Sequence, residues 1–156
     1  MHWHELGRVR SGLVAPDFAL VSGSGDTVMR SQYRQRSNVV LFFIPGSDAR
    51  ALAPVADLLT TRSASFEEAS ARVYAIHPQP DPANGARVLL ADPGDAVRAA
   101  YAGLFPEGHE PGPDEPFALV LDRYGKPWYA GHGALDEAAV DEALTKLWAI
   151  EYDCPE

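Results

Sequence analysis

Residues 41–59, LFFIPGSDARALAPVADLL, contain the change of pattern that decides the expected fold. The β-branched and aromatic run over residues 39–44 is typical of a strand that is buried on both faces of a sheet. A short polar turn follows at residues 46–50. Apolar side chains then recur at helical spacing, at Leu52, Val55, Leu58 and Leu59. The stretch therefore predicts a central strand, a tight turn and a helix.

Two local signals mark the start of that helix. Ser47 and Asp48 are both good N-cap residues, because a short side-chain oxygen accepts a bond from the first free N–H groups of a helix. Pro54 falls inside the helical pattern, where a proline removes a backbone hydrogen bond. We therefore expect the helix to begin at Ser47 or Asp48 and to bend at Pro54.

The rest of the chain alternates strand and helix patterns. In chain order, we expect a hairpin at 15–30, a strand at 72–76, a short strand at 86–92, a helix at 93–104, a Gly/Pro-rich loop at 105–116, a hairpin at 117–131 and an amphipathic helix at 135–150. This order predicts an α/β fold, with a central mixed β-sheet flanked by helices on both faces and an N-terminal β-hairpin extension.

Length and composition suit one compact domain over residues 1–156, with flexible ends at about 1–10 and 151–156. The chain has 156 residues, of which 46% are hydrophobic, enough for one core. The N-terminus lacks the apolar core of a signal peptide, and the longest apolar run is too short to cross a bilayer. We therefore expect a cytoplasmic protein.

The net charge of −9 argues against two classes of partner. Nucleic acid and anionic membrane surfaces would both repel such a chain, so we expect neither. The acidity is concentrated after residue 50, where 18 acids face 7 bases. Most of it is expected to be a solvated surface, and the alternative is a docking face for a basic partner.

Four stretches occur in an informative order: GLVAPDFAL at 12–20, DTVMRSQYRQRSNVVLFFIPG at 26–46, ARVLLADPGDAVRAAYAGL at 86–104 and FALVLDRYGKPWYAGHG at 117–133. Together they resemble the thioredoxin-like superfamily, specifically its peroxiredoxin-like (AhpC/TSA, redoxin) branch, over about residues 10–150. The resemblance implies a thioredoxin-like fold and an antioxidant or thiol oxidoreductase activity.

The residues that the resemblance implies for catalysis are missing. Peroxiredoxins carry a cysteine shortly after the proline that follows the central strand, with a threonine nearby and a supporting arginine later. No cysteine lies near Pro45, and the next threonine is Thr60. Glu115 and Pro116 stand where the arginine is expected, just before the 117–131 hairpin.

The thioredoxin arrangement is missing as well. When GSDARALAP at 46–54 is set against the thioredoxin pattern CGPCKMIAP, Gly46 and Ala49 take the places of the two cysteines. Pro116 then corresponds to the thioredoxin proline whose preceding peptide bond is cis. Gly46, Ser47, Asp48 and Ala49 thus form a degenerate site, because a serine hydroxyl replaces neither a thiolate nor a sulfenic acid.

Cys154 is the only cysteine of the chain. It lies in the C-terminal sequence EYDCPE, whose acidic residues raise the pKa of a thiol and disfavour the thiolate. We expect an unreactive thiol at this position. The alternative is an intermolecular disulfide or a resolving role.

Five polar residues are candidates for binding, because the carboxyl ends of parallel strands meet at one edge of a sheet. They are Ser47, Asp48, Arg50, His77 and His109. Helix N–H groups together with Arg50 would favour a small anionic ligand, whereas Asp48 opposes it. The paired histidines of HWH at residues 2–4 resemble copper- or nickel-catching termini, but such ends are usually incidental, and we expect no metal site.

We therefore expect a peroxiredoxin-like protein without catalytic cysteines that acts as a binding or interaction module. No cofactor is expected, and the partner is either an unidentified protein or a small anion, with a homodimer as a further expectation by analogy. The alternative is a thiol-dependent antioxidant or oxidoreductase that uses Cys154 or a partner's thiol.

Overall fold

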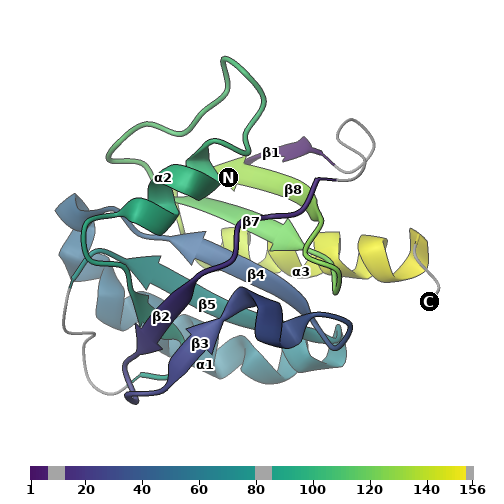
Figure 1. Cartoon of the computed structure of the whole chain (residues 1–156), viewed down its shortest axis with the longest axis horizontal. Coiled ribbons are helices and arrows are strands. Elements are labelled where there is room, and N and C mark those ends of the chain that lie inside the picture. The colour runs from purple at the N-terminus through teal and green to yellow at the C-terminus, as the bar shows by residue number, and fades with distance from the viewer. Residues whose placement is uncertain (7–12, 80–85, 154–156) are drawn as a thin grey trace.

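The computed structural model describes residues 1–6, 13–79 and 86–153, and they form one mixed eight-stranded sheet with helices on both faces (Figure 1). The strand order is β1-β8-β7-β4-β5-β6-β2-β3. The strands are β1 (His2–Glu5), β2 (Ala19–Ser22), β3 (Thr27–Met29), β4 (Asn38–Phe43), β5 (Ala71–His77), β6 (Leu89–Ala91), β7 (Phe117–Leu121) and β8 (Pro127–His132). The α/β prediction with a central mixed sheet is confirmed.

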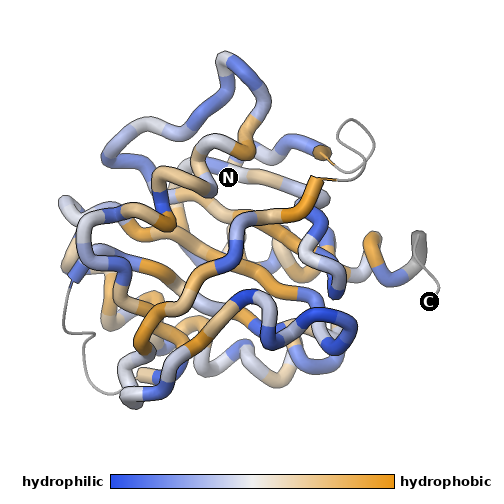
Figure 2. Tube along the Cα trace, viewed as in Figure 1, coloured by the Kyte–Doolittle hydropathy of each residue, from blue (hydrophilic) through white to orange (hydrophobic). Residues whose placement is uncertain are grey.

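Strand β4 lies inside the sheet because both of its faces are apolar. It pairs in parallel with β5 and antiparallel with β7, and all six of its residues are buried. Val40 and Phe42 point into one core, whereas Leu41 and Phe43 point into the other. Figure 2 shows this apolar centre surrounded by more polar loops.

The helices divide between these two cores. Helices α1 (Leu52–Glu68) and α3 (Glu137–Asp153) cover the face of Val40, and α2 (Ala96–Ala102) covers the face of Leu41. Two 3-10 helices, η1 (Arg30–Tyr33) and η2 (Gly46–Ala51), lie before and after β4. Among the described residues, no helix is long and apolar enough to cross a membrane.

Helix α1 begins later than its sequence predicted. The 3-10 helix η2 occupies the turn, so α1 starts at Leu52 with Ala51 at its N-cap, and no side chain caps it. Neither Ser47 nor Asp48 is therefore the N-cap of α1. Pro54 consequently falls in the first turn of α1, where its missing N–H has no helical partner to lose, and α1 continues as one helix from Leu52.

The N-terminus differs from the expected flexible end. Residues 2–5 form β1, which pairs with β8 and places Trp3 opposite Gly131. A β-carbon at Gly131 would lie 2.6 Å from the Trp3 ring, so the indole covers the bare glycine backbone. The Trp3 Nε1 and the Met1 ammonium both bond Glu142 of α3. Packing and polar bonds together thus hold this end in the sheet.

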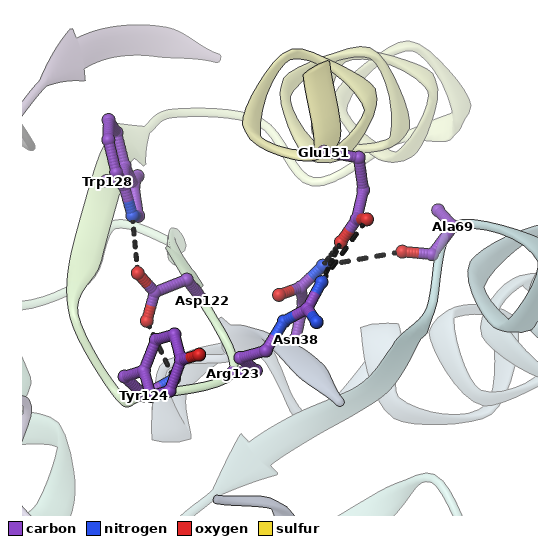
Figure 3. A network of polar contacts seen from close by, with 7 residues as sticks. All are labelled: Asn38, Ala69, Asp122, Arg123, Tyr124, Trp128 and Glu151. Atoms are coloured by element: carbon purple, nitrogen blue, oxygen red, sulfur yellow. Dashed lines mark hydrogen bonds and ion pairs between the residues drawn. The ribbon is translucent and has the colours of Figure 1, made fainter. Parts of the chain in front are cut away.

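A polar network connects α3 to the other end of β4, away from the turn (Figure 3). Glu151 accepts a 2.7 Å hydrogen bond from Nδ2 of buried Asn38, and a 3.2 Å ion pair joins it to Arg123. In the β7–β8 hairpin, Asp122 accepts a 2.8 Å bond from Nε1 of Trp128. Glu151 is therefore ordered within α3, although residues 151–156 were expected to form a flexible end. Residues 154–156 lie outside the described part of the chain.

Candidate functional site

The turn after β4 is exposed, and it lies where the resemblance implies catalytic thiols and the sequence predicted a degenerate site without them. Ile44 and Pro45 are buried, and the next five residues, 46–50, are all exposed. Asp48 departs from helical geometry, with φ −116° and ψ 46°, which kinks the backbone inside η2. A β-carbon at Gly46 would lie 3.0 Å from Cγ of Pro78, so the turn is next to the segment that follows β5.

Ser47 connects this turn to a distant loop. Its Oγ donates a 3.0 Å hydrogen bond to Oδ1 of Asp114, which lies 67 residues later. Asp114 belongs to the loop of residues 103–116 between α2 and β7, which we call the 103–116 loop. This bond places the Asp114 carboxylate at the turn, in contact with Ser47.

Arg98 of α2 holds the 103–116 loop from inside. Its Nη2 donates to the carbonyl oxygens of Gly112, Pro113 and Glu115, at 3.3, 3.4 and 2.7 Å. Its guanidinium carbon lies 4.8 Å from the centre of the Phe117 ring. Burial lowers the pKa of Arg98, with the carboxylates of Asp95, Asp114 and Glu115 acting in the opposite direction. A loop rich in glycine and proline is thus fixed by one side chain.

A pocket of about 250 Å³ opens between α2 and the 103–116 loop. Arg98 and Phe117 line it together with small residues of α2 and the loop, including Ala99, Ala102 and Pro111. Asp95 lines it too, so the pocket combines an apolar wall with one cationic and one acidic side chain.

The peptide bond before Pro116 is trans, as are the other described peptide bonds, so the cis-proline expectation is wrong. The trans form is the intrinsically favoured one, and in it the backbone carbonyl groups of Glu115 and Pro116 accept hydrogen bonds. The Glu115 carbonyl accepts from Arg98, and the Pro116 carbonyl accepts a 3.0 Å bond from the N–H of Gly133.

The structure places the five predicted binding residues in three environments. Ser47, Asp48 and Arg50 share the exposed turn. His77 is buried at the end of β5, where its Nδ1 accepts a 3.1 Å bond from the N–H of Gln79 and its Nε2 has no hydrogen-bond partner among the described residues. Burial lowers the pKa of His77. His109 is exposed on the 103–116 loop.

The ring of His109 packs against residues that the sequence analysis treated as incidental. Its centroid lies 4.9 Å from that of His4, and His4 also lies near His2 and His132. The missed signal was the spacing of His2 and His4, which places both on one face of a strand. Because that strand was not expected, neither was this group of imidazoles.

Two further expectations concern a metal ion and the thiol of Cys154. Among the described residues, no group of three or more His, Cys, Asp or Glu side chains is arranged to hold a metal ion. Cys154 lies outside the described residues.

Neither a protein-family model nor a curated protein matches the sequence. Solved structures do match its fold. The peroxidoxin BcpB from Mycobacterium tuberculosis is 26% identical, with a TM-score of 0.70 over 89% of this chain and 96% of that one. Peroxiredoxin Q from Xanthomonas campestris is 16% identical, with a TM-score of 0.71 over 90% and 98%.

A putative thiol:disulfide interchange protein DsbE from Chlorobium tepidum is 20% identical, with a TM-score of 0.61 over 88% of this chain and 97% of that one. The overall fold of this chain is thus similar to the folds of a peroxidoxin, a peroxiredoxin and a putative thiol:disulfide interchange protein. The chain has the peroxiredoxin-like form of the thioredoxin-like fold, and it carries no cysteine at the turn where the resemblance implies the catalytic thiols.

Proposed function

We propose that this protein is a non-catalytic binding module, and that it binds through the surface formed by the 46–50 turn and the 103–116 loop. The observation that carries the proposal is the bond between Ser47 and Asp114. A catalytic thiolate needs cations or helix N–H groups around it, because these stabilise the negative charge. The Asp114 carboxylate has the opposite effect at this turn.

The same carboxylate argues against a small anion as the ligand. Asp48 and Asp114 both lie at the turn, and Arg50 is its only cation among residues 46–50. The 103–116 loop carries four acids, Glu107, Glu110, Asp114 and Glu115, and neither lysine nor arginine. Like charges repel an anion, whereas a basic polypeptide segment complements this surface. A protein partner is therefore the better candidate.

Reduction of insulin disulfides with dithiothreitol as the reductant tests the proposal. The wild-type protein and Cys154→Ser should both leave the rate at that of the protein-free blank. A catalysed rate in the wild type that Cys154→Ser loses would assign the activity to the tail thiol and overturn the proposal.

A further inference from the structure

Four of the five histidines of this chain lie in one group: His2, His4, His109 and His132. We call it the histidine cluster. Ring centroids are 4.8 Å apart for His2 and His4, 5.6 Å for His2 and His132, 4.9 Å for His4 and His109, and 5.8 Å for His4 and His132. The remaining histidine, His77, is buried at the end of β5.

The cluster joins three separate parts of the chain. His2 and His4 come from β1, His109 from the 103–116 loop and His132 from the end of β8. His2 is paired directly with His132 across the two strands. The Phe105 ring packs edge-on against His4 and His132, at 6.4 and 6.1 Å between centroids. The imidazoles therefore act as packing groups between a sheet edge and a loop.

One carboxylate is in contact with the imidazoles among the described residues. Glu115 Oε2 lies 3.0 Å from His132 Nδ1, and the Arg98 guanidinium acts on the same carboxylate from α2. The N-terminal ammonium is paired with Glu142 of α3. Three segments carry these histidines, and β8 has no acidic residue. The other acids are Glu5 of β1, which has contacts of its own, and Glu107, Glu110 and Asp114 of the loop.

Protonation changes this packing unfavourably. Imidazolium rings at these separations repel one another, and one carboxylate offsets only part of a multiple positive charge. The pKa of His4 is already held below its usual value of 6.5, mainly by burial and then by His2, His109 and His132. Because that pKa is lower in the folded protein, the stabilisation from neutral His4 is fully present above pH 6.5 and is lost as the pH falls.

The carboxylate of Glu115 accepts a hydrogen bond from the N–H of Gly112 and contacts His132, and both interactions hold the pKa of Glu115 below its usual value of 4.5. Its stabilisation is present above pH 4.5 and is lost only below that pH. The Glu115 carboxylate therefore keeps its negative charge above pH 4.5.

We propose that the histidine cluster is an acid-sensitive clasp, which holds β1 and the 103–116 loop on β8 while its rings are neutral and releases β1 when they become protonated. The arrangement depends on four imidazoles from three segments, in which the His4 ring lies next to the other three. Release of β1 would open the edge of β8, whose Trp128 carbonyl now accepts a 2.8 Å bond from the N–H of Leu6. The clasp does not depend on the proposed function.

Amide hydrogen exchange measured between about pH 8 and pH 5, the interval in which histidine titrates, tests the clasp. Rates are corrected for the intrinsic pH dependence of exchange, and all samples contain a chelator. Protection of the β1 and Leu6 amides should fall by about tenfold or more, which corresponds to a loss of about 1.4 kcal/mol in the free energy of local opening. The amides of β4 and β5 should keep their protection.

His109→Gln removes one imidazole from the cluster without altering β1, and His77→Gln is the matched control outside the cluster. The first should reduce the acid-induced loss of protection, and the second should leave it unchanged. Protection of β1 that does not change with pH would overturn the clasp. So would a loss that His109→Gln leaves at full size, or a loss shared by β4 and β5, which would be global unfolding.

Discussion

Ser47 and Asp114 join the turn after β4 to the loop before β7 through one 3.0 Å hydrogen bond. Both residues are exposed, so water competes for the two groups and the bond adds little to global stability. Its effect is local: it places a carboxylate beside the turn and restrains the middle of the binding surface that we propose.

Asp114→Ala should lower the free energy of unfolding by less than about 1 kcal/mol, because the lost hydrogen bond is exposed. Amide exchange in the 103–116 loop should nevertheless become faster. A double-mutant cycle with Ser47→Ala measures the bond itself, and its coupling energy should be at most about 1 kcal/mol. A coupling well above that value would mean that the pair is part of a larger buried network.

Arg98→Lys should destabilise the protein far more. A lysine retains the positive charge but loses the planar guanidinium, whose Nη2 donates to three carbonyl oxygens and whose flat group covers Phe117. We expect a loss of about 1.5–3 kcal/mol in chemical denaturation. Arg50→Lys is the matched control on the exposed turn and should change stability by less than about 0.5 kcal/mol. Equal effects of the two substitutions would contradict the role of Arg98 in holding the loop.

Gly131→Ala should dislodge β1, because the new methyl group would lie 2.6 Å from the Trp3 ring. The expected cost is about 1–3 kcal/mol, the range found for overpacked sites. Adding Trp3→Ala should recover part of this loss, since it removes the ring that the methyl group meets. Gly112→Ala is the control, as its nearest contact would be an ordinary 3.8 Å. Additive effects of Gly131→Ala and Trp3→Ala would show that the two residues do not meet.

Glu151→Ala should cost about 1–3 kcal/mol, because it leaves Nδ2 of buried Asn38 without its 2.7 Å acceptor (Figure 3). Glu151→Gln keeps an acceptor oxygen and should recover much of that loss. Glu68→Ala, at an exposed position near the end of α1, is the control and should be close to neutral. Thermal or chemical denaturation of the three variants distinguishes these outcomes.

The sequence was most informative where one pattern determines one structure. The apolar run of β4 is buried on both faces, as a continuous strand pattern predicts, and Gly125 closes the β7–β8 hairpin with φ +81°. The α/β class followed from the order of such elements, whereas the thioredoxin-like fold was implied by the resemblance of four sequence stretches to that superfamily.

The sequence was least informative where contacts between residues far apart in the chain determine the local structure. The four residues of β1, HWHE, contain no apolar run and gave no strand signal, because β1 depends on Gly131 and Glu142 more than 120 residues later. The start of α1 was misplaced because Ser47 bonds Asp114 and caps no helix. The trans bond before Pro116 likewise reflects contacts with Arg98 and Gly133 that no local pattern contains.

Reintroduced thiols would show whether the turn still supports thiol chemistry. In a Cys154→Ser background, Gly46→Cys with Ala49→Cys should react with a disulfide reagent near neutral pH, since both positions are exposed beside a helix start. Adding Asp114→Asn should raise that rate roughly threefold, because a one-unit fall in thiol pKa gives about tenfold more thiolate of about threefold lower nucleophilicity. A rate that Asp114→Asn leaves unchanged would contradict the effect that we assign to this carboxylate.

The most direct test of the central claim, that this protein performs no thiol catalysis, is the rate of hydrogen peroxide loss with dithiothreitol as the reductant. We predict that the wild-type protein and Cys154→Ser both match the protein-free blank, because the turn holds Gly46, Ser47, Asp48 and Ala49 and no thiol. Multiple turnovers of peroxide by the wild-type protein would contradict the claim, and their loss in Cys154→Ser would identify the thiol responsible.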